Sequence, residues 1–153
     1  MTHLPRWAEL PDLELYLDQV LGLLEKYLSP LFPYAQGQVM TASMVNNYVK
    51  QRLVPPPVKK RYTRRHVSLL MMIGILKPAF ALPQIKALLD GGERGETAAE
   101  LHDRFCTMLE QAYAACAQPP HAPAMDLALL TVAYQSATQA ALPEEGGPCG
   151  ADG

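Results

Sequence analysis

Residues 41–77 read TASMVNNYVKQRLVPPPVKKRYTRRHVSLLMMIGILK, and this stretch decides the fold. An amphipathic helix pattern over about residues 41–53 ends at three consecutive prolines, because proline cannot continue a helix. A second pattern begins after Thr63 and is apolar nearly all round, which predicts a buried helix that ends before Pro78. The segment VKKRY between them favours an extended strand or a turn. The stretch therefore predicts two helices joined by a short loop or a minimal wing.

Helix patterns continue on both sides of this stretch. Residues 12–28 carry leucines at three- and four-residue spacings, which predicts an amphipathic helix capped by Asp12. A loop with Pro33 and Gly37 follows this helix. On the other side, a helix opens at Pro83 and meets the two glycines at residues 91–92.

The C-terminal part begins after a GGERGE linker. Thr97 and Glu100 form a capping box, which predicts the start of a long helix. The neutral, alanine-rich stretch 124–142 predicts a further helix that packs against the long one or against a second subunit. We therefore expect an all-α protein with three parts. These are an N-terminal helical domain (1–92), a helical dimerisation unit (97–142) and a disordered tail (143–153).

Composition fits one well-cored domain with an appended helical unit, since 49% of the 153 residues are hydrophobic. The three cysteines, Cys106, Cys116 and Cys149, form no CxxC pair and leave an odd count. This count does not suit a disulfide framework, so we expect a cytoplasmic protein. The N-terminus has no cationic start followed by an apolar core, which argues against a secretory signal, and no stretch resembles a membrane span.

Charge is distributed unevenly along the chain. No acidic residue stands between Glu25 and Asp90, although the formal net charge of the whole chain is -2. The cations of that interval are Lys26, Lys50, Arg52, Lys59, Lys60, Arg61, Arg64, Arg65, Lys77 and Lys86. Residues 59–65, KKRYTRR, hold five of them within seven positions. This asymmetry predicts a polyanionic partner, most often nucleic acid.

The helix over residues 41–53 carries the candidate base readers. An asparagine side chain can bond N6 and N7 of adenine together in the major groove, so Asn46 and Asn47 are candidates for sequence readout. Lys50 lies one turn further along the same side of the helix. Thr41 and Ser43, at the helix start, are candidates for binding phosphate together with the free backbone N–H groups there.

The basic cluster supplies the candidate phosphate contacts, which fix register without reading sequence. They are Lys59, Lys60, Arg61, Arg64 and Arg65. Tyr62 is a further candidate for a DNA contact. Alternatively, it packs the wing against the core. His66 is interpreted as a capping or phosphate-facing side chain and Trp7 as a hydrophobic anchor for the N-terminal arm.

The order of these parts resembles the DNA-binding half of the MerR regulators. In that family a recognition helix with an aromatic residue is followed by a leucine-proline turn, a basic wing with a tyrosine, a buried helix and a helix of the type SLEEIRELL. Similar parts here are Tyr48, the turn at 53–57, the segment 59–62, the helix 67–77 and the segment 82–89. With its LPRWAELPD start, the chain also resembles a bacterial family of unknown function that carries this MerR-like segment. The MerR resemblance implies that residues 1–92 form a winged helix-turn-helix domain, which binds double-stranded DNA as a homodimer.

Enzyme chemistry finds little support in the residues. The carboxylates follow helix surfaces at spacings typical of solubilising charge, and there is neither a glycine-rich phosphate loop nor a nucleophile motif. We expect no catalytic residue, cofactor or metal site. Because some MerR regulators bind metal through cysteines, thiol or metal sensing was weighed, but Cys106 and Cys116 lie too far apart along one helix to share a metal.

Transcriptional regulation through sequence-specific DNA binding is therefore the hypothesis from sequence. The competing hypothesis is a non-enzymatic interaction module whose basic face docks an acidic protein. The two hypotheses make different predictions for Asn46 and Asn47. A protein that reads DNA sequence needs these side chains, whereas a surface that binds an acidic protein by charge does not.

Overall fold

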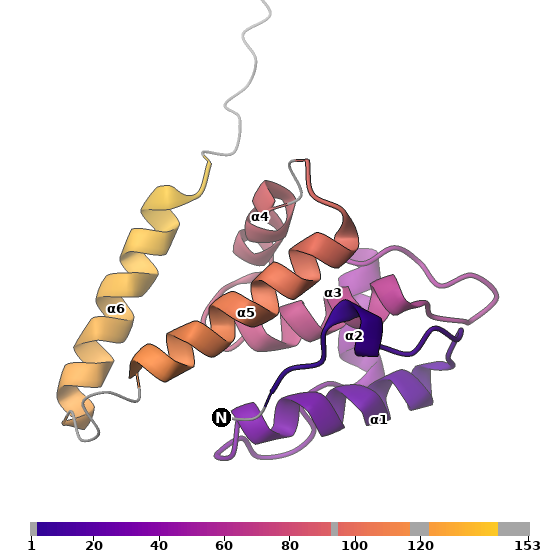
Figure 1. The fold of residues 1–153 in the computed structure, drawn as a ribbon, viewed down its shortest axis with the longest axis horizontal. Helices are drawn as coiled ribbons and strands as arrows, with labels where there is room; N and C mark the ends of the chain where they lie inside the picture. The colour runs from indigo at the N-terminus through magenta and orange to yellow at the C-terminus, as the bar shows by residue number, and fades with distance from the viewer. Residues whose placement is uncertain (1–2, 93–94, 117–122, 144–153) are drawn as a thin grey trace, which may run out of the picture.

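The computed structural model describes residues 3–92, 95–116 and 123–143. The secondary-structure elements in chain order are η1 (Trp7–Glu9), α1 (Leu17–Leu28), η2 (Ser29–Leu31), α2 (Ala42–Lys50), α3 (Arg64–Leu76), α4 (Leu82–Gly92), α5 (Ala98–Cys116) and α6 (Ala124–Ala141) (Figure 1). In the described ranges, β structure is limited to two isolated antiparallel bridges. The expectation of an all-α protein is confirmed at this level.

Helix α3 is the centre of the fold. All nine residues from His66 to Gly74 are buried, so the prediction of a helix apolar nearly all round is confirmed. Helices α1 and α5 pack on different sides of α3, and in Figure 1 α5 crosses in front of it. Because a helix buried along its whole middle needs partners all round, α3 organises the elements that precede and follow it.

Helix α1 begins later than the leucine spacing predicts. The helix starts at Leu17, and the prediction that Asp12 caps it is wrong. Leu15 is extended instead: its N–H donates to Tyr62 O and its O accepts from Tyr62 N–H, both at 2.8 Å. Through these bonds, the backbone N–H and C=O of Leu15 both have hydrogen-bond partners without being part of a helix. At the true start, the Tyr16 N–H donates to Gln19 Oε1 at 2.9 Å.

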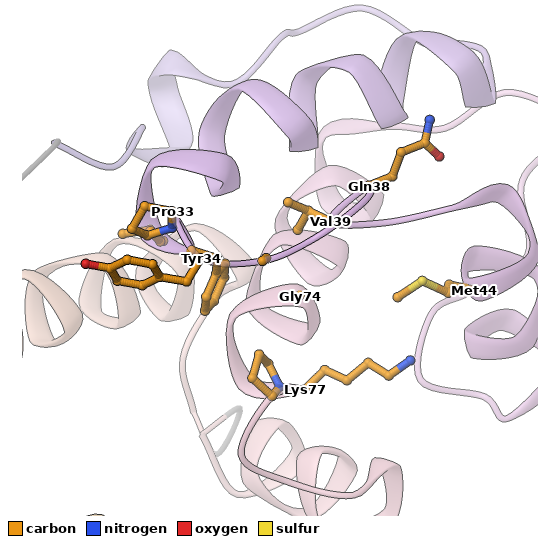
Figure 2. A pocket seen from close by; sticks show the side chains of 11 residues that line it. Pro33, Tyr34, Gln38, Val39, Met44, Gly74 and Lys77 are labelled. Carbon is orange, nitrogen blue, oxygen red and sulfur yellow. The ribbon is translucent and has the colours of Figure 1, made fainter. Parts of the chain in front are cut away.

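A loop at residues 32–39 joins η2 to α2 and passes over the C-terminal end of α3 (Figure 2). The Val39 N–H donates to Glu25 Oε2 at 3.0 Å, which ties the end of the loop to α1. Thr41 then caps α2, since its Oγ1 accepts from the Met44 N–H at 3.2 Å. The predicted start of this helix is confirmed.

The end of α2 and the following turn depend on three cations with left-handed backbones. Helix α2 ends at Lys50, earlier than the predicted Leu53, because Arg52 has φ 62° and the Leu53 N–H closes back on Tyr48 O at 3.0 Å. This 6→1 bond is the Schellman ending, which usually places glycine at the Arg52 position. Further on, Lys59 and Lys60 have φ 51° and 61° between the paired residues Val58 and Arg61. The predicted minimal wing is thus a two-residue turn.

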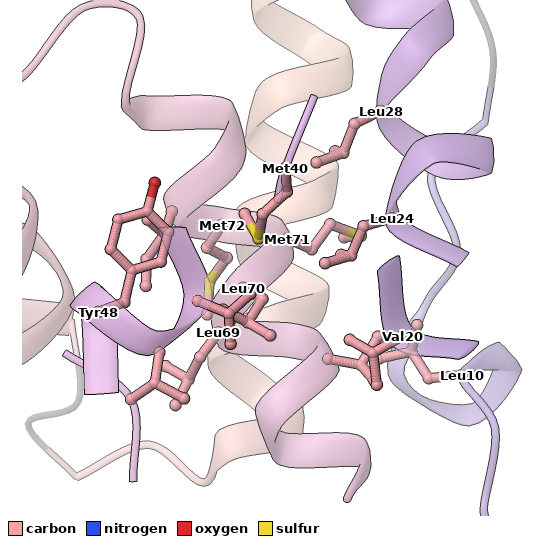
Figure 3. Close-up of a cluster of buried hydrophobic side chains, with 14 of the residues drawn as sticks. Leu10, Val20, Leu24, Leu28, Met40, Tyr48, Leu69, Leu70, Met71 and Met72 are labelled. Atoms are coloured by element: carbon pink, nitrogen blue, oxygen red, sulfur yellow. The ribbon is translucent and has the colours of Figure 1, made fainter. Parts of the chain in front are cut away.

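One hydrophobic core joins the elements from the N-terminal arm to α5 (Figure 3). Leu24 and Leu28 of α1 approach from one side and Tyr48 of α2 from the other, with Met71 and Met72 of α3 between them. The buried side chains Leu101 and Cys106 of α5 belong to the same core. Packing therefore joins α5 to the preceding helices, and the division between 1–92 and 97–142 stays a prediction.

The C-terminal helices differ in their packing. The capping box of α5 is confirmed: the Thr97 N–H donates to Glu100 Oε2 at 2.9 Å and the Glu100 N–H to Thr97 Oγ1 at 3.2 Å. Helix α4 includes both glycines, 91 and 92, rather than ending before them. Helix α6 has no buried residue. The predicted disordered tail lies, from residue 144 on, outside the described residues.

No helix in residues 3–92, 95–116 and 123–143 combines the length and apolar character needed to cross a bilayer.

Candidate nucleic-acid interface

The polar side of α2 lies on the surface of the molecule. Ser43, Asn46, Asn47 and Lys50 are all exposed. On the opposite side of the same helix, the core residues Val45 and Tyr48 are fully buried. This division follows from the helical period, which places positions three and four apart on one side. The side chains predicted to read bases therefore share one exposed surface.

Thr41 has a defined role at the start of α2. Its hydroxyl oxygen accepts the Met44 N–H, so it satisfies one of the free amide groups of the first turn. Among the predicted phosphate contacts at this end, Ser43 keeps an exposed side chain.

The turn after the prolines presents two lysines in an unusual backbone conformation. Turns with φ > 0 at both central residues favour Asn-Gly, because in the left-handed region the Cβ atom of most L-residues lies too close to the following carbonyl oxygen. That region costs roughly 1–2 kcal/mol per residue for most L-amino acids. Lys59 and Lys60 nevertheless occupy both positions and are exposed. Together with Arg52, they place three cations where glycine or asparagine would be less strained.

Two cations of the predicted cluster are paired with the N-terminal arm, which we define as residues 3–16. Arg61 Nη1 lies 3.6 Å from Glu14 Oε2, and its guanidinium is 5.6 Å from the ring centroid of Tyr16. Arg64 Nη2 lies 3.5 Å from Asp12 Oδ1, and its guanidinium is 5.7 Å from the Trp7 ring centroid. Sequence reasoning missed these contacts, although both acids stand close before the first helix.

Arg64 is the more enclosed of these two cations. It is half-buried, and its Nε is a buried atom without a hydrogen-bond partner among the described residues. Stacking on Trp7 adds a cation–π attraction. We infer that Arg64 positions the arm as well as contributing positive charge.

Arg65 and Arg52 line one shallow groove, which has a volume of about 350 Å³. Pro55 and Pro56 form part of its wall and Asp90 contributes an acid at its edge. The groove brings Arg52, just after α2, next to the predicted phosphate contact Arg65 in the first turn of α3.

Tyr62 belongs to the core rather than to the basic surface, which we define as the exposed polar side of α2 together with Arg52, Lys59, Lys60, Arg61, Arg64 and Arg65. It is only 4% exposed, and its ring meets that of His66 edge to face at a centroid distance of 5.4 Å. Burial also raises the pKa of Tyr62. We therefore remove Tyr62 from the proposed DNA contacts, which corrects the prediction. Its other interpretation, packing between wing and core, agrees with this burial.

His66 joins the start of α3 to the proline turn. Its Nδ1 accepts from the Thr63 N–H at 3.0 Å, so Nε2 carries the proton and donates to Pro55 O at 3.0 Å. The capping interpretation is confirmed. The histidine thereby holds Pro55 and the two-lysine turn at fixed places on α3.

A second polar cluster ties the N-terminal arm to α5. The Arg6 guanidinium makes a bidentate ion pair with Glu110, at 3.0 and 2.7 Å, and the Leu4 N–H donates to Glu110 Oε1 at 2.8 Å. The Trp7 N–H donates to Asp103 Oδ1 at 2.7 Å. The Arg6 side chain and the Leu4 N–H hold the pKa of Glu110 down at about 2. We call these contacts, with those of His102, the arm–α5 seam.

His102 is the buried member of the arm–α5 seam. Its Nδ1 lies 2.7 Å from Ser68 Oγ, and its Nε2 lies 2.9 Å from Pro5 O. Because Pro5 O can only accept, Nε2 carries the proton and the Ser68 hydroxyl donates to Nδ1. Burial lowers the pKa of His102, and burial raises the pKa of the neighbouring Cys106 thiol to about 11.

Sequence reasoning named Trp7 as an anchor but missed the seam on α5. The available signal was spacing: His102, Cys106 and Glu110 recur every four residues and so share one side of the helix. Cys106 is a buried free thiol and Cys116 an exposed one, while Cys149 lies outside the described residues. Within the described ranges, no three His, Cys, Asp or Glu side chains gather closely enough to hold a metal ion.

Comparisons with known proteins identify a family, but its description names no activity. Neither the curated proteins nor the solved structures contain a match to this chain. A family model described as a domain of unknown function, DUF1836, matches residues 5–116. The match starts in the N-terminal arm and ends with α5, so it covers the basic surface and all of the arm–α5 seam except Leu4. The chain belongs to the DUF1836 family.

Proposed function

We propose that this protein is a MerR-like, sequence-specific regulator of transcription that binds double-stranded DNA through α2 and the two-lysine turn. One observation carries the proposal: the exposed polar side of α2 is followed closely by three cations held in left-handed backbone conformations. Strained residues persist where surrounding structure enforces them, and they cluster at functional sites. If these cations only kept the protein soluble, lysines with unstrained backbone conformations would do so equally well.

The chemistry of α2 suits the major groove. Asn46 and Asn47 are exposed, so each can offer its amide to adenine, and a good bidentate pair is worth roughly 1–3 kcal/mol of base discrimination. Lys50, Lys59 and Lys60 would contact phosphates on either side of the groove. Each phosphate neutralised adds about 0.9 to the salt dependence of binding.

Homodimerisation is the second part of the proposal, and α6 supports it. This helix leaves six large hydrophobic side chains exposed: Met125, Leu127, Leu129, Leu130, Val132 and Tyr134. Apolar surface of this kind is unfavourable in water and favours association. A dimer formed through α5 and α6 would present two α2 helices to half-sites about one helical turn apart. Gel filtration with light scattering tests this directly, and a monomer would contradict it.

The experiment for DNA binding is selection from a randomised duplex pool, followed by fluorescence anisotropy at several salt concentrations. We expect enrichment of a two-fold symmetric motif. Asn46→Ala or Asn47→Ala should weaken binding to that motif by about 5- to 150-fold, which corresponds to roughly 1–3 kcal/mol. Gln36→Ala, at an exposed position before α2 and outside the proposed dimer helices, is the matched control and should leave affinity unchanged. Recovery of a pool without any enriched motif would contradict sequence-specific recognition.

The ion pairs of the N-terminal arm favour one alternative, an interaction module for an acidic protein. Arg61 and Arg64 already contact carboxylates of the chain itself, so the basic surface can bind acidic side chains. For such a module, Lys59→Ala and Lys60→Ala would weaken binding while Asn46→Ala would not. Failure to bind any duplex at low salt, with retained binding of an acidic peptide, would favour this alternative.

A further inference from the structure

A cavity of about 510 Å³ lies between the loop at residues 32–39, the inner side of α2 and the end of α3 (Figure 2). Its size falls within the range of small-molecule sites. The apolar and aromatic side chains on its wall include Leu31, Phe32, Tyr34, Val39 and Met44. Gly74 contributes bare helix backbone to the floor, and the core below it is tightly packed, since a methyl group there would come within 2.7 Å of Leu28 Cδ1.

Lys77 is the charged side chain among the residues that line the cavity. Lys77, the C-cap residue of α3, lies on the wall, and Gln38 is the other residue there with a charged or amide side chain. Among the described residues, no carboxylate pairs with Lys77, whose ammonium instead lies 5.2 Å from the ring centroid of Tyr48. No residue of the lining carries a carboxylate, and the Glu25 carboxylate beside it accepts the Val39 N–H at 3.0 Å. An apolar body with one negative group therefore matches this wall better than a cation does.

Tyr48 is a buried residue whose ring lies against the cavity residue Lys77. Tyr48 is fully buried and lies one helical turn from Met44, yet its hydroxyl makes no hydrogen bond within the described part of the chain. Buried hydroxyl groups nearly always have a partner, so the Tyr48 hydroxyl is an exception at this end of α2.

We infer that this cavity binds a small apolar carboxylate, whose carboxylate meets Lys77 and whose hydrocarbon body lies among Phe32, Val39 and Met44. A ligand at this position can shift α2, because it contacts Met44 on the inner side of the helix. The outer side of the same helix carries Asn46 and Asn47. This coupling to DNA affinity rests on the proposed function, whereas ligand binding itself does not.

The test uses the full chain with ¹³C-methyl-labelled methionine and three probes of similar shape: phenylacetate, phenylacetamide and phenethylamine. We expect phenylacetate to shift the Met44 methyl signal saturably while the Met125 signal on α6 stays in place. Phenylacetamide should bind about tenfold more weakly, since a charge-assisted contact is roughly twice as strong as a neutral one. Phenethylamine should not bind.

Lysine variants then locate the charge. Lys77→Met should remove the preference for phenylacetate over phenylacetamide, and Lys77→Arg should keep it. Lys86→Met, at an exposed position of α4, is the matched control and should behave as the original protein does. Methionine signals of each variant report whether it folds. Equal affinities for phenylacetate and phenylacetamide, or shifts confined to methionines other than Met44, would overturn the site.

A second arm separates this site from the DNA proposal. Saturating phenylacetate should change the affinity for the selected duplex at least about twofold, because a ligand shifts an equilibrium only through different affinities for its two states. An unchanged affinity, alongside a saturable Met44 shift, would overturn the coupling to α2. If no duplex binds at all while Met44 still shifts, the DNA proposal fails and the carboxylate site stands.

Discussion

The arm–α5 seam and the basic surface use polar residues in opposite ways. In the seam, Arg6, His102 and Glu110 each have defined partners at hydrogen-bonding distance. On the basic surface, Lys59 and Lys60 are exposed and have left-handed backbones. Satisfied polar groups stabilise a fold, whereas strain and uncompensated charge reduce its stability. The comparison indicates that the seam contributes to stability and the basic surface to binding.

The largest expected effect is on the seam. His102→Ala should lower the free energy of unfolding by about 3 kcal/mol, because it leaves a cavity and removes the partners of Ser68 Oγ and Pro5 O. Urea denaturation measures the change. Gln111→Ala, on the exposed side of the same helix, is the control and should shift stability by less than about 0.5 kcal/mol. Equal stabilities of the two variants would show that the seam is not a stabilising element.

The next effect should have opposite signs for stability and binding. The double variant Lys59→Asn, Lys60→Gly supplies the residues that the turn favours and should raise the free energy of unfolding by about 1–2 kcal/mol. The same change removes two cations, so the salt slope of duplex binding should fall by about two. Lys86→Asn changes one cation without changing this turn. If the double variant is more stable but binds DNA with unaltered affinity, the strained lysines do not take part in DNA binding.

Acid should destabilise the seam in two steps. His102 has a lowered folded pKa, so the unfolded chain takes up its proton first and stability falls as pH drops below the ordinary histidine value of 6.5. Glu110 contributes stability that is complete above its ordinary value of 4.5 and is lost as pH falls toward its folded pKa of about 2. Melting temperatures from pH 8 to 2 measure both steps. Glu110→Gln should flatten the lower step and leave the upper one, and an unchanged lower step would refute the assignment.

The smallest expected effect on stability is at the base-reading positions. Asn46→Ala and Asn47→Ala each alter an exposed helix position, where alanine is the better helix former, so thermal unfolding should change by less than about 0.5 kcal/mol. Helix content by circular dichroism should also stay the same. A large loss of stability would mean that these asparagines support the fold instead of being available to a ligand.

Much of the helical framework was predictable because its signals are local. Thr41, Thr63 and the Thr97–Glu100 pair mark helix starts through side chains that lie within one turn of the helix they cap. The start of α1 was not predictable in this way, because Leu15 pairs with Tyr62, which lies far along the chain. The burial of Tyr62 has the same non-local cause.

The candidate site was predictable in composition but less so in detail. Exposure of Asn46, Asn47 and Lys50 follows from helix periodicity. The pairing of Arg61 and Arg64 with the N-terminal arm depends on tertiary packing that brings Glu14 and Asp12 across to them. The left-handed backbone at Lys59 and Lys60 could not be predicted, because the sequence signal for such a turn is a pair such as Asn-Gly, and two lysines do not give that signal.

The most direct test is to follow the ¹⁵N amide and side-chain signals of the full chain while adding a selected DNA duplex at moderate salt. The account predicts shifts at the Asn46 and Asn47 side chains and at residues 59–60, with the seam signals of His102 and Glu110 unchanged. Shifts confined to α6 or to the seam, or an unchanged spectrum even at low salt, would contradict DNA binding by this surface.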